Sequence, residues 1–306
     1  MRSEISISFC RATHSRLRQV RFIRPQALVV RNARLTVRAS KLQLLAIPGQ
    51  HWRLRATCAI AVMAKASIAG GTKTRLVPPL TQEQAATLNT VFLRDAADNI
   101  LAAAELADIS GWMAYAPTGS APFFRAHLPD SIGLIETVAP TLGECLLNAA
   151  ALFLQAGHGS VCLINSDSPT LPVGYLVAAA TALAAPGDRI VLGASTDGGY
   201  YLIGLKRPHA RLFEDIAWST DQVSHQTRVR AKELNLAVVE LPTWYDVDDA
   251  EALQILLDEL IDGRGFREVG SDPTRAIWTR GYLSTLVKNC DLRARLNAMR
   301  ITDRLA

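Results

Sequence analysis

Short runs of apolar residues alternate along this chain with longer segments in which apolar residues recur at helical spacing. The first apolar run, 58–63, is too short for a typical helix but long enough for a buried strand. Runs of the same kind follow at 112–116, 133–137, 161–164, 190–193, 200–205 and 237–241. Patterns typical of helices begin near Thr81, Thr141, Leu176, Asp221 and Asp249. Strands separated by helices predict an α/β fold, in which a mostly parallel, Rossmann-like sheet lies between two helical layers (α/β/α).

The composition changes near residue 58. Residues 1–57 hold eleven Arg and one Lys against a single acid, Glu4, which gives a charge of +11. Since the whole chain carries +5, the remaining residues carry −6, and the net charge gives no support to nucleic-acid binding. We expect residues 1–57 to be a disordered tail, or upstream sequence translated from a misplaced start codon. An organelle transit peptide of similar composition is the alternative.

The rest of the chain is expected to divide after Leu260. Residues 58–260 contain all the alternating segments, whereas 261–306 follow a break at Gly263 and Gly265 and look like a small helical tail. No run of 18 apolar residues is present, so no membrane span is expected. The five Cys form no C-x-x-C pair, which favours a reducing compartment and a cytoplasmic protein. The oligomeric state is left open.

The segment after the first predicted strand combines glycine with positive charge. It spans residues 65–76 and offers Lys65, Gly70, Gly71, Lys73 and Arg75. Ligands of open α/β sheets bind at the carboxyl ends of the strands. The loop is therefore predicted to surround a diphosphate with amide donors and cations. An ordinary solvated basic loop is the alternative.

An aspartate follows the predicted strand 161–164. Asp167 stands where a carboxylate could hold Mg²⁺ or Mn²⁺, hard cations that prefer oxygen ligands and bridge to phosphate. The alternative is that Asp167 forms an Asx-turn or helix cap before Pro169.

A second aspartate, Asp197, follows the predicted strand 190–193 and precedes Gly198 and Gly199. The two glycines would let a substrate lie against the backbone. Asp197 could then hold a hydroxyl of the sugar or acceptor, or act as a catalytic base. Asp-Gly is also a strong hairpin signal, so a plain turn is the competing interpretation.

Two more aspartates follow the last predicted strand. Asp246 and Asp248 would point the same way in an extended segment. Since Asp248 and Glu251 have capping-box spacing, we assign Asp248 mainly to the cap of the last helix. Asp246 is then predicted to be functional, as a second metal ligand or a catalytic group.

Together these segments resemble a bacterial family of glycosyltransferase-A-like (GT-A) proteins. Its members are called radical-SAM/selenodomain-associated or arsenosugar-biosynthesis transferases. Five motifs occur in the family's order: K-x-P-x-x-G-x-x-K-T-R-L at 65–76, G-x-D-x-P-x-L at 165–171, D-G-G-Y-Y-L-I-G-L at 197–205, W-S-T at 218–220 and D-V-D at 246–248. Two positions differ from the pattern: Ser67 replaces Pro, which should loosen the phosphate loop slightly, and Asn165 replaces Gly beside the metal position.

The resemblance implies the fold of the nucleotide-diphospho-sugar transferase superfamily. It also implies that Lys73 and Arg75 contact phosphates and that Asp167 holds the metal. The leading hypothesis is metal-dependent transfer of a sugar from a nucleotide-diphosphate sugar to a small acceptor. Guanylyltransferase-like transfer of a nucleotide from an NTP, with release of pyrophosphate, is the rival reaction. A non-catalytic nucleotide-binding or partner protein is a third possibility.

Overall fold

The computed structural model describes residues 51–266 and 273–303. The predicted disordered leader falls mostly outside these ranges, but its last part, His51–Ala56, forms helix α1. Seven strands follow: β1 Cys58–Lys65, β2 Ile109–Ala116, β3 Gly133–Glu136, β4 Ser160–Ile164, β5 Arg189–Ser195, β6 Tyr200–Leu205 and β7 Ala237–Trp244. The other helices are α2 Gln82–Ala104, α3 Ala121–His127, α4 Leu142–Gln155, α5 Val173–Ala184, α6 Val223–Glu233, α7 Ala250–Leu260, α8 Ile277–Asn289 and α9 Leu292–Asp303, with short 3-10 turns η1 Thr74–Leu76 and η2 Ala210–Phe213.

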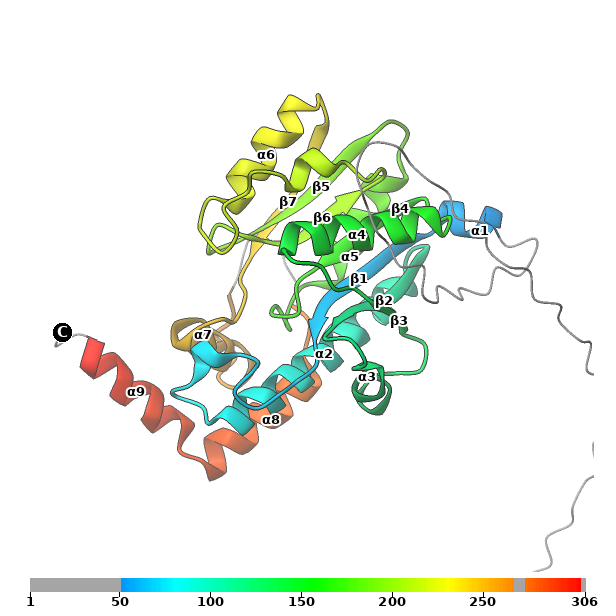
Figure 1. Cartoon of the computed structure of the whole chain (residues 1–306). Helices are drawn as coiled ribbons and strands as arrows, with labels where there is room; N and C mark the ends of the chain where they lie inside the picture. Colours follow the sequence, from blue (N-terminus) through cyan, green and yellow to red (C-terminus); the bar gives the residue numbers. More distant parts are fainter. Residues whose placement is uncertain (1–50, 267–272, 304–306) are drawn as a thin grey trace, which may run out of the picture. The chain divides into compact units, whose positions relative to one another are not determined.

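The strands form one sheet in the order β3-β2-β1-β4-β6-β5-β7 (Figure 1). All neighbouring pairs are parallel except those of β6, which runs antiparallel to both β4 and β5. The mostly parallel α/β sheet predicted from the sequence is therefore confirmed. Because β5 and β6 form a hairpin, the turn between them lies at the same edge as the carboxyl ends of β1, β4 and β7.

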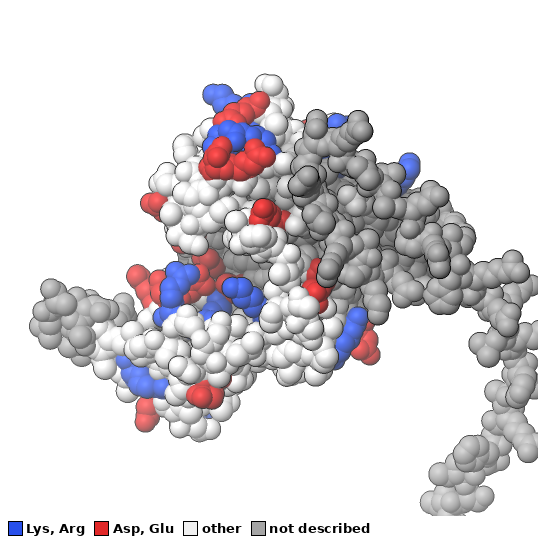
Figure 2. Space-filling view, viewed as in Figure 1, with Lys and Arg blue, Asp and Glu red and all other residues white. Residues whose placement is uncertain are grey.

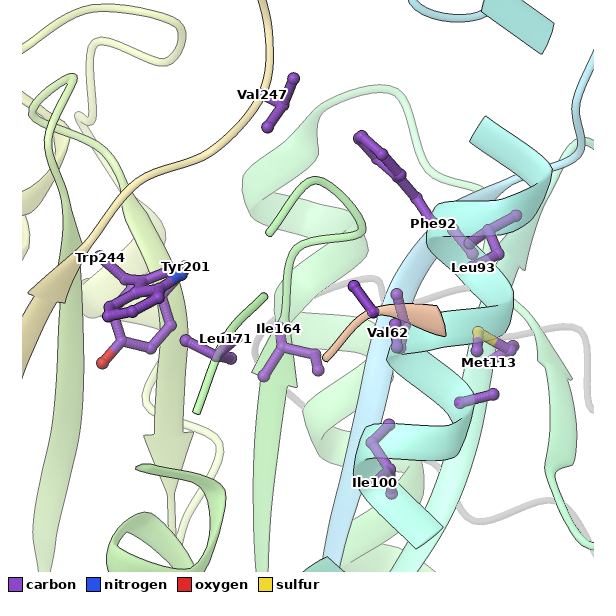
Figure 3. Packing of buried hydrophobic residues seen from close by; sticks show 14 of the residues in the cluster. Val62, Phe92, Leu93, Ile100, Met113, Ile164, Leu171, Tyr201, Trp244 and Val247 are labelled. Carbon is purple, nitrogen blue, oxygen red and sulfur yellow. The ribbon is translucent and has the colours of Figure 1, made fainter. Parts of the chain in front are cut away.

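The two faces of the sheet are buried by different helices. Alternate residues of β1 divide between two apolar clusters: Ile60 and Val62 belong to one, and Ala59 and Ala61 to the other. The first cluster includes buried residues of α2, α5, α7 and α8, and the second includes those of α4, α6 and η2. Figure 3 shows the first cluster, where Phe92 of α2 lies near Val247 of the segment after β7. The chain is thus a three-layer α/β/α structure.

Two of the long helices begin where the sequence predicted. The Thr81 hydroxyl accepts from the amide of Gln84, and the Gln84 side chain accepts from the amide of Thr81. Thr141 and Glu144 form the same reciprocal pair at the start of α4. Both pairs are capping boxes, and each satisfies amide donors that the first helical turn leaves without a partner.

The chain beyond residue 260 is tied to the domain. Helix α8 packs along α2, and its Leu283 and Leu286 are buried in the first cluster. The Asp95 carboxylate of α2 accepts from the amides of Trp278 and Thr279, at 3.1 and 2.8 Å, which caps the start of α8. Residues 273–303 therefore extend the helical layer on that face of the sheet.

Candidate active site

The loop after β1 brings its lysine to the carboxyl edge of the sheet. Gly70 has φ of +73° and Lys73 has φ of +52°, so the chain turns sharply twice before η1. Ser67, which stands where the family pattern has Pro, accepts from Asn89 Nδ2 at 2.9 Å and from Thr90 Oγ1 at 2.8 Å. These two hydrogen bonds hold the start of the loop against α2.

Lys73 joins three loops at one point. Its Nζ lies 2.9 Å from Asp167 Oδ1, 3.1 Å from Asp248 Oδ1 and 2.7 Å from the carbonyl oxygen of Val247. Only 6% of the side chain is exposed. All three protons of the ammonium group therefore have acceptors, and the lysine ties the loop after β1 to those after β4 and β7.

Arg75 is the exposed cation of the same loop. Its Nη2 lies 2.6 Å from Asp248 Oδ2, while 73% of its side chain remains exposed. The guanidinium therefore has donors left over for an anionic ligand. Lys65, at the end of β1, is also exposed to solvent, and Gly70 and Gly71 shape the loop between Lys65 and Lys73.

Asp167 is ionised at this meeting point. Burial raises the pKa of its carboxyl, but the Lys73 charge and the hydrogen bonds from Ser166 and Lys73 outweigh burial, and the pKa is lowered overall. Ser166 Oγ donates to Asp167 Oδ1 at 2.6 Å. The Asp167 carboxylate is therefore held as a fixed negative charge. Its contacts are those expected of an ionised carboxylate. The backbone amide of Asp167 donates only a weak hydrogen bond, of 3.4 Å, to Asn165 Oδ1.

Asp246 has the opposite character. Burial, followed by the charges of Asp197, Asp248 and Asp167, raises its pKa to about 7. For Asp248, burial and the charge of Asp167 raise the pKa despite the opposing influence of Lys73 and Arg75. The charges of Asp197, Asp248 and Asp167 thus lie close enough to act on Asp246, which is poised to exchange a proton near neutral pH.

Asp197 lies in the turn of the β5–β6 hairpin, as the competing interpretation predicted. Its Oδ1 accepts from the amide of Gly199 at 2.8 Å, which fixes the turn. Gly198 has φ of +89°, and a Cβ there would lie 2.2 Å from the backbone oxygen of Asp221. Only glycine fits at Gly198. The turn places the Asp197 charge where it contributes to the raised pKa of Asp246, so a structural and a functional role are compatible.

The assignment of Asp248 to the helix cap is wrong. Asp249 is the N-cap of α7, and its Oδ1 accepts from the amide of Ala252 at 2.8 Å. Asp248 is turned instead toward Lys73 and Arg75. An N-cap side chain accepts from the backbone amide two or three residues later in the chain. Because Asp248 and Asp249 are neighbours, either of them could cap the same helix by this rule. The sequence therefore could not separate them, and it gave no signal for the carbonyl of Val247 or the hydroxyl of Ser166.

The side chains at this edge suit a hard divalent cation. Within residues 51–266 and 273–303, no three His, Cys, Asp or Glu side chains are grouped so as to hold a metal ion by themselves. Asp167 and Asp248 nevertheless converge on one cation, the Lys73 ammonium. Mg²⁺ is commonly held by one or two carboxylates together with water and substrate phosphates. The two carboxylates, Asp167 and Asp248, therefore fit such an ion.

The surface is hollowed at this position. Figure 2 shows basic and acidic side chains gathered at the rim of a hollow, on the side that carries α7. The site is thus an open, charged depression at the carboxyl edge of the sheet, the usual place for ligands in open α/β folds.

Within residues 51–266 and 273–303, every helix is too short or too polar to cross a bilayer.

Comparison with known families gives a partial match. The family model described as “Uncharacterized protein conserved in bacteria (DUF2064)” matches residues 99–220. This range is less than half of the chain; it contains Asp167 and Asp197 but neither the loop after β1 nor Asp246. No curated protein matches the chain.

One solved structure shares the fold, and others match at lower TM-scores. The structure of a “putative nucleotide-diphospho-sugar transferase” from Desulfovibrio desulfuricans G20 matches with a TM-score of 0.65 and 24% identity, over 79% of this chain and 97% of that one. CMP:2-keto-3-deoxy-manno-octonic acid synthetase complexed with CTP matches with a TM-score of 0.45 and 10% identity, over 68% and 99% of the two chains. A cytidylyltransferase from Leptospira borgpetersenii serovar Hardjo-bovis (strain JB197) gives 0.42 and 12%, over 77% and 96%. The chain has the α/β fold of the Desulfovibrio protein, a seven-stranded, mostly parallel sheet between layers of helices.

Proposed function

We propose that this chain is a metal-dependent glycosyltransferase that moves a sugar from a nucleotide-diphosphate sugar to the hydroxyl of a small acceptor. The observation that carries the proposal is geometric: the cations Lys73 and Arg75 of the loop after β1 meet the carboxylates Asp167 and Asp248 at one edge of the sheet. Asp246 adjoins this group, and the nearby negative charges and burial raise its pKa to about 7. Transfer to a hydroxyl requires removal of its proton, and a carboxylate with a pKa near neutrality is suited to that work. The catalytic domain in this proposal is residues 58–260.

The cations of the loop after β1 would bind the donor. Lys73 is held at the base of the site and Arg75 at its open side, so the two can contact a diphosphate from different directions. A bound Mg²⁺ or Mn²⁺ would add positive charge beside the leaving diphosphate. Asp167 and Asp248 are the carboxylates we assign to it, because both already face one cation.

The two aspartates nearest the β5–β6 hairpin, Asp246 and Asp197, would take part in deprotonating the acceptor. Asp246 would accept the proton of the attacking hydroxyl, and Asp197 would keep Asp246 from ionising too readily through its nearby negative charge. Gly198 and Gly199 would let the acceptor approach the backbone. Assigning Asp248 to the metal leaves Asp246 free to act as the base.

Nucleotidyl transfer to a phosphate or carboxylate is less well supported by this arrangement than transfer to a hydroxyl. A phosphate or carboxylate nucleophile is already ionised near pH 7 and needs no base. An aspartate with a pKa near 7 would then serve no purpose in the chemical step. The reaction class is decided by incubating the protein with Mg²⁺ or Mn²⁺, a panel of nucleotide-diphosphate sugars and NTPs, and candidate acceptors. Release of nucleoside diphosphate supports the proposal, whereas release of pyrophosphate contradicts it.

The absence of both products with every donor would favour a binding or partner protein. Nucleotide affinity measured in the same samples separates that outcome from an inert chain. The proposal then rests on metal-dependent nucleotide binding, which Asp167→Ala should abolish. Unchanged binding in that variant would remove the metal role from Asp167.

A further inference from the structure

A buried carboxylate lies behind the candidate site and takes no part in the proposed chemistry. Glu259, on the last turn of α7, is 9% exposed, and one of its oxygens, Oε1, has no hydrogen-bond partner. A buried, incompletely paired carboxylate is unfavourable, and an apolar residue of similar size would stabilise the fold more. Burial raises the pKa of the Glu259 carboxyl, in keeping with this unfavourable position. The residue therefore calls for a specific explanation.

The other oxygen of Glu259 joins two hydroxyl groups. Tyr245 donates its hydroxyl proton to Glu259 Oε2. Thr170 Oγ1 lies 3.1 Å from the same oxygen and 3.1 Å from the Tyr245 hydroxyl. Tyr245 and Thr170 are 2% and 0% exposed. The three groups thus form a closed polar cluster within an apolar layer, where hydrogen bonds are strong because water is excluded.

The cluster connects the two acidic loops of the site. Thr170 follows Asp167 in the loop after β4, and Tyr245 immediately precedes Asp246. The same two loops are joined by the Ser168 hydroxyl, which donates to the carbonyl of Tyr245 at 2.9 Å, and by the amide of Val247, which donates to the carbonyl of Asp167 at 2.9 Å. The cluster adds further side-chain contacts to this junction, beside those of Ser168 and Lys73.

The far side of the Asp167 loop is held by chain from beyond α7. The amide of Thr274 donates to the carbonyl of Thr170 at 3.1 Å, and its hydroxyl donates to the carbonyl of Leu171 at 2.7 Å. Asn99 Nδ2 of α2 donates to the same Leu171 carbonyl at 2.8 Å. The loop is therefore fixed on one side, so its spacing from the Asp246 loop depends on the contacts on the other.

We infer that Glu259 and Tyr245 are positioning residues, which set the distance between the Asp167 loop and the Asp246 loop through Thr170. This inference rests on the proposed function for its catalytic meaning, because that function places a metal ligand on one loop and the base on the other. Partners that orient metal ligands from behind commonly change metal affinity by about 10- to 100-fold when removed. Neither Glu259 nor Tyr245 contacts the substrate in this scheme.

The test compares Tyr245→Phe and Glu259→Met, which remove the cluster, with Glu259→Gln, which keeps an oxygen acceptor. Leu253→Ala, in the apolar side of α7, is the control for destabilisation, and Glu251→Gln, exposed on the same helix, is the surface control. The first readout is a ratio of two hydrogen-exchange rates, that of the Val247 amide divided by that of the Leu192 amide in β5. We expect Tyr245→Phe and Glu259→Met to raise this ratio at least tenfold.

Leu253→Ala should raise the exchange rates of both amides together, so the ratio should stay the same. In Glu259→Gln, the ratio should be close to that of the parent protein. A ratio that is unchanged in Tyr245→Phe and Glu259→Met, or that rises equally in Leu253→Ala, overturns the inference. This readout needs no metal and no substrate, so it decides the positioning role even if the proposed function fails.

The second readout is the affinity of each full-length variant for Mn²⁺ alone, measured by calorimetry. We expect Tyr245→Phe and Glu259→Met to bind Mn²⁺ at least tenfold more weakly, with Glu259→Gln restored and Leu253→Ala unchanged. Asp167→Ala distinguishes the two claims. If Asp167→Ala does not alter Mn²⁺ affinity, the metal site is wrong. If it abolishes binding while the cluster variants bind normally, the cluster does not position the ligand and the inference fails.

Discussion

The ammonium of Lys73 and the carboxylate of Asp167 form an ion pair, with Nζ 2.9 Å from Oδ1, at the point where the loops after β1 and β4 meet. Lys73 is almost fully buried, whereas about a quarter of Asp167 is exposed. In the absence of a donor, the lysine thus neutralises the carboxylates that would otherwise repel one another. Under the proposed function, a divalent ion bound by those carboxylates would leave the Lys73 ammonium available to a diphosphate.

Removal of this cation is the first prediction. Lys73→Met should destabilise the fold by roughly 3 kcal/mol, because it leaves two partly buried carboxylates without their counter-charge. It should also lower kcat/KM by at least 100-fold through loss of charge at the leaving diphosphate. Lys288→Met, on the exposed side of α8, is the matched control and should change neither quantity. Chemical denaturation and steady-state kinetics measure the two effects.

The catalytic role proposed for Asp246 predicts a pH dependence. With its pKa at about 7, the base is protonated and inactive at lower pH, so kcat/KM should rise about tenfold per pH unit up to pH 7 and then level off. Asp246→Asn should lose roughly 10²- to 10⁴-fold in rate together with this dependence. A variant that is slow but keeps the rise near pH 7 would assign the titration to another group.

The same residue predicts an effect on stability. The folded-state pKa of Asp246 is raised, so the folded protein binds its proton more tightly than the unfolded chain does, and ionisation is unfavourable to folding. The contribution of Asp246 to the free energy of unfolding should therefore fall as pH rises from about 4 to about 7 and stay low above about pH 7. Asp246→Asn should be more stable than the parent protein at pH 8, and the difference should disappear near pH 4. Thermal unfolding at several pH values measures it.

The sequence predicted which loops form the site, because the ends of the strands can be recognised in the sequence. Short apolar runs gave the strands, and the residues after them supplied Lys73, Asp167, Asp197 and Asp246, which the fold brings to one edge. The hairpin that reverses β6 was signalled only by the Asp-Gly turn. Such success depends on local pattern, because a strand and its following loop are adjacent in the chain.

Contacts between distant segments were not predictable in this way. Nothing near Glu259 in the sequence indicates that it meets Thr170, and nothing near Thr274 indicates that it holds the same loop. These contacts depend on how α7 and the following chain pack on the sheet. The predicted end of the domain at Leu260 rested on glycines alone, and the sequence pattern does not show that α8 packs on α2.

The hairpin turn predicts a strict requirement for glycine. Gly198→Ala should destabilise the fold by roughly 1–3 kcal/mol from backbone strain alone, because φ is +89°, and the clash with the Asp221 backbone adds to this. Gly281→Ala, in the interior of α8, meets no atom within 4 Å and should stabilise by about 1 kcal/mol. Denaturant unfolding of the two variants makes the comparison. Equal effects of the two substitutions would show that the turn relaxes.

The neighbouring aspartates Asp248 and Asp249 predict two separable defects. Asp249→Ala removes the N-cap of α7 and should destabilise by about 1 kcal/mol, with nucleotide affinity retained. Asp248→Ala leaves the cap intact but removes the carboxylate shared by Lys73 and Arg75, so it should weaken Mn²⁺-dependent nucleotide binding at least tenfold. Its own raised pKa means that its ionised form is unfavourable to folding, so little stability should be lost.

Unfolding and nucleotide titration of both single variants and of the double variant measure these effects. The two defects should add, because the cap contacts the amide of Ala252 whereas Asp248 contacts the phosphate loop. The reverse pattern, with Asp248→Ala losing stability and Asp249→Ala losing nucleotide, would return Asp248 to the cap. The metal site would then have to be built from Asp167 and Asp246, and Asp246 could no longer serve as the base.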